Sequence, residues 1–363
     1  MQFRLPTFRP RFVGVDGALQ SGHHSSDREG LWRARHRCHR VWTNDDDGAR
    51  GGDACHAETG RVIRPRRARL NDSRDIESRI VWLLGSPRSG STWLLQLLAR
   101  LTGGAQVREP LIGAHLGLSV GGLLGVAVSE DPLLIDSMTH RSSYFFADDA
   151  VDAWKPPLRT LLVNRFRLEA RRHEATSGRP ADPIIVKDPW GSVGAPVLLR
   201  TLPRSRLLFL IRDGRDVVDS LLDGEADGWI TKTLGARIDG APTRERAIEH
   251  HSQMWVRSIE AVHRAFGLHP PSLRLLVKYE SLNAEAETEL RRIVRWLGRD
   301  DLLDQVEQVA EDMQFSNYPD SAKGTGKFLR AASPGLWRER FSFDERMRLQ
   351  EMMRPTLEKF GYD

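Results

Sequence analysis

The stretch LLGSPRSGSTW, residues 83–93, has the glycine spacing of a loop that binds phosphate. Gly85 and Gly90 keep the G-x-x-x-x-G spacing of the nucleotide phosphate loop, and Thr92 stands in its hydroxyl position, but Ser91 replaces its lysine. Consecutive backbone N–H groups that precede a helix N-terminus bind an anion whatever the next side chain is. The loop therefore predicts phosphate binding without the lysine that spans the β and γ phosphates of a triphosphate.

Arg88, three residues before Ser91, is the positive charge that can replace the missing lysine. The acids of VKDP and LIRDG are flanked by Lys and Arg, so neither is placed as a separate Mg²⁺ ligand. A donor that needs no Mg²⁺ must present less charge than a γ-phosphate, and a sulfuryl group has one negative charge instead of two. We expect a nucleotide that is bound without a metal.

The segments GSPRSGSTW and LIRDGRDVVDSLL together resemble the two donor-binding motifs of the sulfotransferases that use PAPS, 3′-phosphoadenosine-5′-phosphosulfate. The resemblance covers roughly residues 80–363. It implies that the first motif holds the 5′-phosphosulfate, and that Arg212 and Ser220, eight residues apart, hold the 3′-phosphate. The donor-binding residues that it implies are Arg88, Ser89, Gly90, Ser91, Thr92, Trp93, Arg212, Ser220, Tyr279, Lys327 and Arg330.

Two further segments extend the resemblance. VKYESL is similar to the family strand end whose tyrosine contacts adenine, which implies this role for Tyr279, and Trp93 occupies the adenine-stacking position after the loop. RAASPGLWRERFS resembles the R-K-G-x-x-G-x-W-K segment that closes on the 3′-phosphate. Arg330 matches its arginine, but alanines replace its Lys-Gly, which leaves Lys327 as a possible substitute.

The chain resembles tyrosylprotein, carbohydrate and many bacterial sulfotransferases in three features. These are an arginine in the loop, a K-D-P strand end and a glutamate about twenty residues after the loop. This implies that Glu109, 21 residues after Arg88, is the general base. It also implies that Arg88 and Lys187 stabilise charge on the bridging and leaving oxygens. Lys187 could instead pair with Asp188, and His115, His250 and His251 are alternative bases.

These residues must be positioned by an α/β domain. Apolar runs at 80–84, 183–189, 206–216 and 273–282 end in charged residues and alternate with helical segments, which predicts a parallel sheet covered on both faces. The expected fold is P-loop NTPase-like, with three layers and a central parallel sheet. Because ligands bind beyond the carboxyl ends of such strands, we expect the site there. The predicted helices are 91–101, 157–175, 214–223, 243–266, 285–297 and 343–360.

The first 79 residues differ from the rest of the 363-residue chain. They contain 16 Lys and Arg against 11 Asp and Glu, whereas residues 80–363 have 38 of each, so the net charge of +5 belongs to this segment. Their short polar clusters show no helix or strand period, which predicts a disordered basic arm before a sulfotransferase domain at 80–363. Diffuse binding of this arm to nucleic acid or membrane is the alternative to solvated disorder.

Cysteine and hydropathy patterns give three further expectations. Cys38 and Cys55 both lie in the arm, and their spacing with nearby histidines fits no standard zinc finger, so we expect no metal site. The uncharged stretch 111–128 reaches the length of a membrane span, but its glycines favour a buried helix or a substrate-side segment. MQFRLPTFRPRF has no apolar core typical of a signal peptide, so we expect a cytoplasmic protein.

The expected reaction is metal-independent, in-line transfer of a sulfuryl group from PAPS to a hydroxyl or amine, which yields 3′,5′-ADP. The expected acceptor is a small molecule, glycan, lipid or peptide. We expect residues 111–160 and 224–250 to form the pocket that binds it. A phosphate-loop kinase and a non-catalytic protein that binds 3′,5′-ADP are the alternatives. We expect no specific nucleic-acid partner, and the sequence does not determine the oligomeric state.

Overall fold

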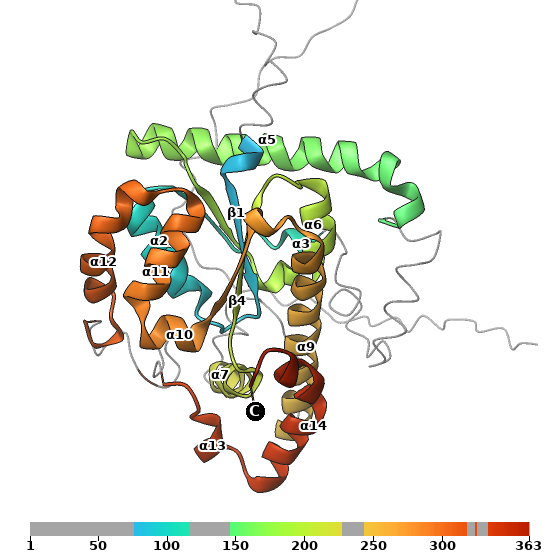
Figure 1. Ribbon diagram of the computed structural model, residues 1–363. Coiled ribbons are helices and arrows are strands. Elements are labelled where there is room, and N and C mark those ends of the chain that lie inside the picture. Colours follow the sequence, from blue (N-terminus) through green and yellow to red (C-terminus); the bar gives the residue numbers. More distant parts are fainter. Residues whose placement is uncertain (1–75, 116–145, 227–242, 318–323, 325–332, 363) are drawn as a thin grey trace, which may run out of the picture. The chain divides into compact units, whose positions relative to one another are not determined.

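The computed structural model of this chain describes residues 76–115, 146–226, 243–317, 324 and 333–362 (Figure 1). Every described residue belongs to one compact unit, which lies within residues 66–363. The predictions for residues 1–75, for Lys327 and Arg330, and for most of the uncharged stretch 111–128 therefore lie outside the described residues. Of the predicted arm, residues 76–79 form a helical turn in which Ile76 and Glu77 are buried.

A parallel sheet forms the centre of the fold, as predicted, but it has five strands, one more than the four apolar runs of the sequence indicated. Its order is β2-β3-β1-β4-β5, with all neighbours parallel. The strands are β1 (Ile80–Gly85), β2 (Ala105–Arg108), β3 (Ile184–Lys187), β4 (Arg206–Ile211) and β5 (Arg274–Lys278). Strand β1 is central, and it pairs Leu83 with Lys187 on one side and with Leu208 on the other.

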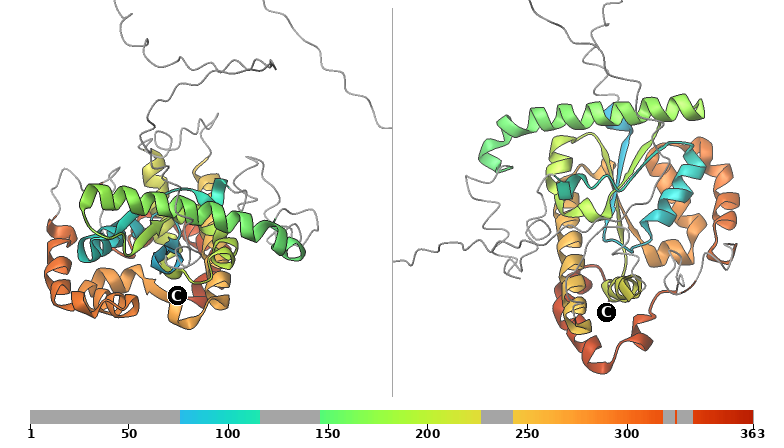
Figure 2. Two further views of the ribbon diagram at one scale, coloured as in Figure 1. Left: turned by 90° about the horizontal axis from the view of Figure 1, so that it is seen from above. Right: turned by 180° about the vertical axis from the view of Figure 1, so that it is seen from behind.

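Helices cover both faces of the sheet, so the predicted three-layer arrangement is confirmed. Successive residues of β1 point to opposite faces: Trp82 and Leu84 pack in one apolar core, and Val81 and Leu83 pack in the other. The first core includes α5, α6, α7, α9 and α14, and the second includes α2, α10, α11 and α12. Figures 1 and 2 show α2, α11 and α12 on one side of the sheet and α6 and α9 on the other. Because a fully buried large apolar side chain stabilises the fold by about 1.5–3 kcal/mol, a one-residue slip of a strand, which exchanges the faces, is strongly disfavoured.

The long helices follow the predicted ranges, with small shifts at their ends. They are α2 (Ser91–Thr102), α5 (Val151–Ser177), α7 (Gly214–Ala226), α9 (Arg244–Leu268), α11 (Ala286–Leu297) and α14 (Phe343–Lys359). Helix α5 begins six residues earlier than predicted, so that Pro156 and Pro157 lie inside it, as its sixth and seventh residues, rather than at its start. Helix α14 begins with a capping box between Ser342 and Glu345, and Gly361 follows it with a φ of 67°, as expected of a C′ glycine.

Shorter elements connect these helices and strands. They are α3 (Ile112–His115), η1 (Asp148–Ala150), η2 (Pro189–Gly194), α6 (Ala195–Thr201), η3 (Pro271–Leu273), α10 (Tyr279–Ala284), η4 (Asp300–Gln305), α12 (Val306–Asp312), η5 (Phe315–Asn317) and α13 (Trp337–Arg340). No helix among the described residues is long and apolar enough to cross a membrane.

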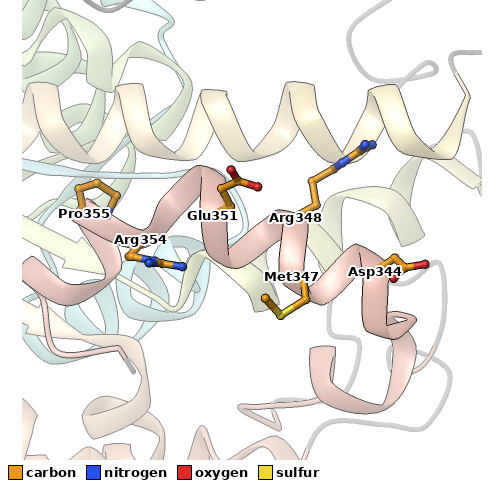
Figure 3. A pocket seen from close by; sticks show the side chains of 6 residues that line it. All are labelled: Asp344, Met347, Arg348, Glu351, Arg354 and Pro355. Atoms are coloured by element: carbon orange, nitrogen blue, oxygen red, sulfur yellow. The ribbon is translucent and has the colours of Figure 1, made fainter.

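A hollow of about 590 Å³ lies on α14. It is lined by Asp344, Met347, Arg348, Glu351, Arg354 and Pro355 (Figure 3). Arg348 in this lining pairs with Glu245 and Glu249 of α9. The hollow contains none of the predicted site residues.

Candidate active site

The predicted site residues meet at the carboxyl end of the sheet. The phosphate loop follows β1, Lys187 is the last residue of β3, and Arg212 follows β4 directly. Tyr279 follows β5, and Glu109 follows β2, the strand that the sequence did not predict. Because all five strands are parallel, these five strand ends lie at one edge, where an α/β sheet binds its ligand.

The loop between β1 and α2 has the backbone of an anion-binding site. Gly85 lies so close to β4 that an added Cβ would stand 2.0 Å from the carbonyl oxygen of Leu210. Arg88 has a φ of 63° and Gly90 a φ of 88°, so both adopt the left-handed conformation that turns the chain into α2. Ser86 and Ser89 are fully buried, and neither hydroxyl has a hydrogen-bond partner among the described residues. Such hydroxyls are available to an anion in the loop.

Gly90 also makes room for Tyr279. A Cβ at position 90 would lie 2.5 Å from Cδ2 of the Tyr279 ring, and the guanidinium carbon of Arg212 lies 4.5 Å from the centre of the same ring. Tyr279 is therefore buried between the loop and Arg212, where its exposure is only 6%. The three residues, which come from three strand ends, form one packed unit.

Replacing Gly90 by Ala should destabilise the protein more than replacing Gly178 by Ala. Both glycines have positive φ, at 88° and 67°, so alanine at either position costs about 1–2 kcal/mol in backbone strain. An added Cβ at Gly178 meets nothing within 4 Å, whereas at Gly90 it overlaps Tyr279, which adds roughly 1–3 kcal/mol. Denaturant unfolding measures both variants, and equal losses would contradict the Gly90–Tyr279 contact.

Arg88, Arg212 and Ser220 lie together in the structure. Arg88 Nε donates to Ser220 Oγ at 2.9 Å, and Arg212 Nη1 donates to the carbonyl oxygen of Arg88 at 3.0 Å. The Nε of Arg212 is buried and has no partner among the described residues. Ser220 reaches the site from α7, which begins two residues after Arg212. The eight-residue spacing therefore lets Arg212, at the strand end, and Ser220, on the helix, both contact Arg88 of the phosphate loop.

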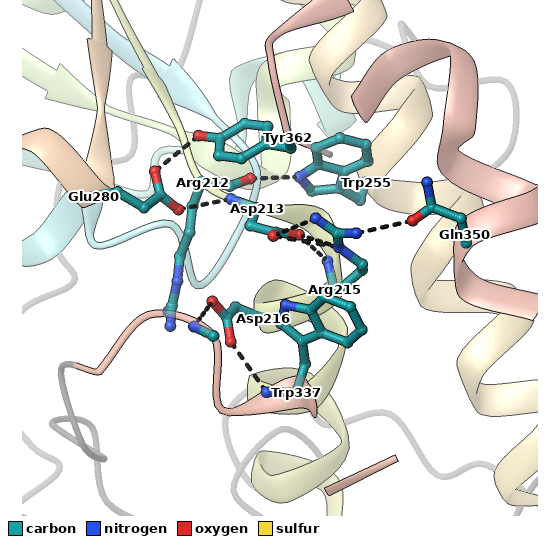
Figure 4. Close-up of polar contacts among 10 residues, drawn as sticks. Arg212, Asp213, Arg215, Asp216, Trp255, Glu280, Trp337, Gln350 and Tyr362 are labelled. Atoms are coloured by element: carbon teal, nitrogen blue, oxygen red, sulfur yellow. Dashed lines mark hydrogen bonds and ion pairs between the residues drawn. The ribbon is translucent and has the colours of Figure 1, made fainter. Parts of the chain in front are cut away.

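A polar network behind Arg212 was not predicted (Figure 4). Glu280 accepts hydrogen bonds from the backbone N–H of Asp213 at 2.9 Å and from the hydroxyl of Tyr362 at 2.8 Å. Burial and the neighbouring Glu280 raise the pKa of Tyr362, so its hydroxyl keeps the proton that it donates. Trp255 Nε1 donates to the carbonyl oxygen of Arg212 at 3.2 Å. These contacts fix the backbone from which Arg212 extends.

A second unpredicted network attaches the segment before α14 to α7 (Figure 4). Asp216 accepts hydrogen bonds from the backbone N–H groups of Gly335 at 2.7 Å and Trp337 at 3.4 Å. Burial raises the pKa of Asp216, although the nearby charge of Arg212 opposes this. The guanidinium of Arg215 lies 4.2 Å from the Trp337 ring centre and pairs with Asp213. Gly335 and Trp337, the glycine and tryptophan of the predicted closing segment, are thus held beside the site.

Trp93 lies in the first turn of α2 beside Tyr279. Its indole N–H donates to the carbonyl oxygen of Met313 at 2.9 Å, and the two ring centres are 6.4 Å apart in an edge-on arrangement. The side chain is half-buried. Ser91 is buried at the start of the same helix. The hydrogen bond to Met313 fixes the orientation of the Trp93 ring at the rim of the site.

Lys187, Glu109 and Thr92 form a polar triad beside the loop. Lys187 Nζ donates to Thr92 Oγ1 at 3.0 Å and forms an ion pair with the Glu109 carboxylate. The side chain of Lys187 is 5% exposed and that of Glu109 is 39% exposed, so the glutamate stands on the solvent side of the pair. A buried cation and an accessible carboxylate therefore lie together at the rim of the phosphate loop. The alternative pairing of Lys187 with Asp188 is not observed: Lys187 pairs with Glu109.

Asp188 contacts backbone instead. Its Oδ1 accepts the N–H of Leu111 at 3.2 Å, and its Oδ2 accepts that of Ile112 at 2.9 Å. The sequence placed Asp188 next to Lys187 but offered no signal for these contacts, which span 77 and 76 positions. Of the alternative bases, His250 and His251 lie in α9 with their ring centres 5.3 Å apart, and His115 ends α3.

Comparisons with known proteins agree with the motifs. The family described as "Sulfotransferase family" matches residues 81–303. A Caenorhabditis briggsae protein named "Putative protein-tyrosine sulfotransferase" is 23% identical over 194 residues, which are 52% of this chain and 64% of that protein. The match thus spans less than two thirds of the relative's length.

The chain is also similar, at low sequence identity, to solved structures. Mouse sulfotransferase SULT7A1, complexed with PAP, is 11% identical, with a TM-score of 0.47 over 77% of this chain and 85% of that one. Sulfotransferase STF9 from Mycobacterium avium is 15% identical, with a TM-score of 0.46 over 78% of this chain and 77% of that one. The family assignment rests on the match to residues 81–303, which cover more than half of the chain. The chain therefore belongs to the sulfotransferase family.

Proposed function

We propose that this protein transfers a sulfuryl group from PAPS to a hydroxyl group or an amine and releases 3′,5′-ADP (PAP). The observation that supports this is a cluster of buried donors at the loop. Ser86 Oγ, Ser89 Oγ and Arg212 Nε have no hydrogen-bond partner among the described residues. A buried donor without a partner costs about 1–3 kcal/mol, and phosphosulfate oxygens would remove this cost. The residues present fit a phosphorylated, anionic donor.

Each residue of the site has a role that its position supports. Arg88, Lys187 and the loop N–H groups bind the 5′-phosphosulfate, and Arg212 and Ser220 bind the 3′-phosphate. The acceptor oxygen forms the new S–O bond while the S–O bond to phosphate breaks in line. Glu109 takes the acceptor proton, and Lys187 stabilises the charge on the departing phosphate oxygen. The Glu109–Lys187 pair sets the base beside the cation that the leaving group needs.

The adenine is assigned to the side of the loop where Trp93 and Tyr279 lie. The Trp93 ring is oriented by its bond to Met313 and half-buried, which suits stacking. Tyr279 is covered by Arg212 and Gly90, so its contribution is to contact adenine at its edge and to hold Arg212. Lys327 and Arg330 keep their predicted role at the 3′-phosphate.

Binding of PAP should raise the melting temperature of the protein, whereas ATP with Mg²⁺ should raise it little. A ligand at 100 times its dissociation constant stabilises a protein by about 2.7 kcal/mol, which corresponds to roughly 5–10 °C for a domain of this size. The site offers Arg88 in place of the P-loop lysine, so it is matched to a donor of lower charge. Differential scanning fluorimetry with both ligands makes the comparison. Stabilisation by ATP·Mg²⁺ alone would favour a kinase and contradict this proposal.

Binding alone does not separate an enzyme from a protein that only holds PAP. Incubation of the protein with ³⁵S-labelled PAPS and an extract of its source, followed by mass spectrometry of labelled products, separates them and identifies the acceptor. The name of the C. briggsae relative makes a tyrosine-containing peptide the first defined acceptor to assay. Residues 80–363 contain no cysteine, which suits a reducing compartment, and we assign the reaction to the cytoplasm.

A further inference from the structure

We propose that Asp188 is a positioning residue for the base Glu109: its carboxylate holds the strained backbone at 109–112 through two N–H groups. This inference rests on the proposed function, since it concerns the base of that reaction. Asp188 is fully buried and lies directly after Lys187. Each of its oxygens accepts one backbone N–H, from Leu111 and from Ile112.

The backbone segment that Asp188 holds has an unfavourable conformation at two residues. Glu109 has a φ of 47° and Leu111 a φ of 53°, and neither is a glycine. Left-handed φ is unfavourable for side chains with a Cβ, and Glu109 also precedes Pro110, which restricts it further. Such conformations persist where surrounding contacts determine them, and they occur at functional sites. The two N–H bonds to Asp188 and the bond from Glu109 N to the carbonyl oxygen of Lys187, at 2.7 Å, are those contacts.

The turn at 188–192 is shaped to present this carboxylate. An added Cβ at Gly191 would lie 2.3 Å from Asp188 Oδ2, and one at Gly113 would lie 2.1 Å from the carbonyl oxygen of Gly191. Both glycines therefore permit the close approach of η2 and α3. Ser192, in the same turn, accepts the N–H of Gly85 at 3.0 Å. One turn thus supports the phosphate loop on one side and the base on the other.

The carboxylate must be ionised for both of its oxygens to accept. Burial raises the pKa of Asp188 to about 6, the three backbone N–H groups of Ile112, Leu111 and Gly191 oppose this, and the charge of Glu109 adds to the rise. Among the described residues, the charged group that acts on it is Glu109, from the end of β2. As the pH falls through about 6, one oxygen gains a proton and can no longer accept its N–H. Asp188→Asn reproduces this loss at neutral pH, because the amide keeps a single acceptor oxygen.

Hydrogen–deuterium exchange of the intact protein tests the contact without an acceptor. In Asp188→Asn, the protection factors of the Leu111 and Ile112 amides should fall at least tenfold, while those of β1 and β4 should not change. In the wild type, protection at these two amides, corrected for the intrinsic exchange rate, should fall between pH 7 and pH 5. The pH series serves even if the variant fails to fold. Unchanged protection at 111–112 in both experiments would overturn the proposal.

A double-mutant cycle tests whether Asp188 acts through Glu109. Transfer from ³⁵S-PAPS to the acceptor labelled in the extract should be about tenfold slower in kcat for Asp188→Asn, with the PAP-induced thermal shift retained. In the Glu109→Gln background, adding Asp188→Asn should cause no further loss, because the base that it positions is already absent. Additive losses would overturn the inference. If Glu109→Gln itself transfers at the wild-type rate, the proposed base is wrong rather than its support.

Asp216→Asn is the matched control. Asp216 is also a buried carboxylate that accepts two backbone N–H groups, those of Gly335 and Trp337, but it does not contact residues 109–112. Its variant should lose protection at 335–337 and leave that of 111–112 unchanged. Its effect on transfer should add to that of Glu109→Gln. Coupling of the control to Glu109 as strong as that of Asp188 would contradict a specific positioning role.

Discussion

Glu109→Gln should lower kcat for sulfuryl transfer by about 10²- to 10⁴-fold, the range for loss of a positioned general base. The amide keeps the size of the carboxylate and can still accept a hydrogen bond from Lys187, so the loop around it should keep its geometry. Because Glu109 is 39% exposed and stands outside the loop that binds phosphate, PAP should bind the variant as tightly as the wild type. The measurement is transfer of ³⁵S from PAPS, with PAP affinity from calorimetry.

The chain offers a closely matched control for this variant. Glu260 accepts from Lys359 Nζ and Thr356 Oγ1, at 2.7 and 2.9 Å, in a Lys–Glu–Thr triad between α9 and α14 that parallels Lys187, Glu109 and Thr92. Glu260→Gln should leave transfer unchanged, because its triad lies outside the proposed site. A rate for Glu109→Gln within threefold of the wild type would exclude Glu109 as the base, and a histidine would then have to be sought.

The parts of the site that could be predicted are those in which all the residues of a motif lie within one short segment of the sequence. The loop at 85–92 is a strand, a turn and a helix in sequence, and the spacing of Arg212 and Ser220 is fixed within a strand end and the helix after it. Burial on both faces makes strands such as β1 and β4 continuous apolar runs, which a sequence shows directly. For these elements the local sequence pattern matches the position of the element in the fold.

Strand β2 was missed for a physical reason. It lies at the edge of the sheet, it has four residues, and its sequence AQVR leaves Gln106 and Arg108 exposed, so it has no continuous apolar run. Its position nevertheless decides where Glu109 lies. The resemblance to a sulfotransferase subgroup implied the role of this glutamate, and the structure places it after a fifth strand end, next to β3.

The supporting contacts could not be predicted because they join segments that are distant in the sequence. Asp188 accepts from residues 76 and 77 positions earlier, and Tyr362 donates to Glu280 across 82 positions. A carboxylate beside a lysine is interpreted from sequence as its ion-pair partner, yet Lys187 pairs with Glu109 and leaves Asp188 to the backbone. Which partner a buried carboxylate takes depends on the packing around it, here on the absence of a Cβ at Gly191.

Lys187→Met should lower kcat by about 10²- to 10³-fold, the effect of removing one electrostatic group that stabilises charge in the transition state. The thioether fills the same buried space but cannot donate to Thr92 or to the leaving oxygen. Removing one partner of an ion pair is strongly destabilising where the other charge stays buried, but Glu109 can turn to water because it is partly exposed, and the apolar side chain has no charge to desolvate. Stability should therefore stay within about 1 kcal/mol of the wild type or rise, so that a lower rate cannot be attributed to unfolding.

The same substitution in the remote triad, Lys359→Met, should change neither transfer nor PAP binding, since Lys359 pairs with Glu260 on α9. The comparison of single-turnover rates with denaturant unfolding of both variants separates chemistry from packing. If Lys187 acts only by holding Glu109, the loss in Lys187→Met should vanish in the Glu109→Gln background. If it acts on the departing oxygen, as we expect, a loss of at least tenfold should persist there, because the charge on that oxygen develops whether or not a base takes the acceptor proton.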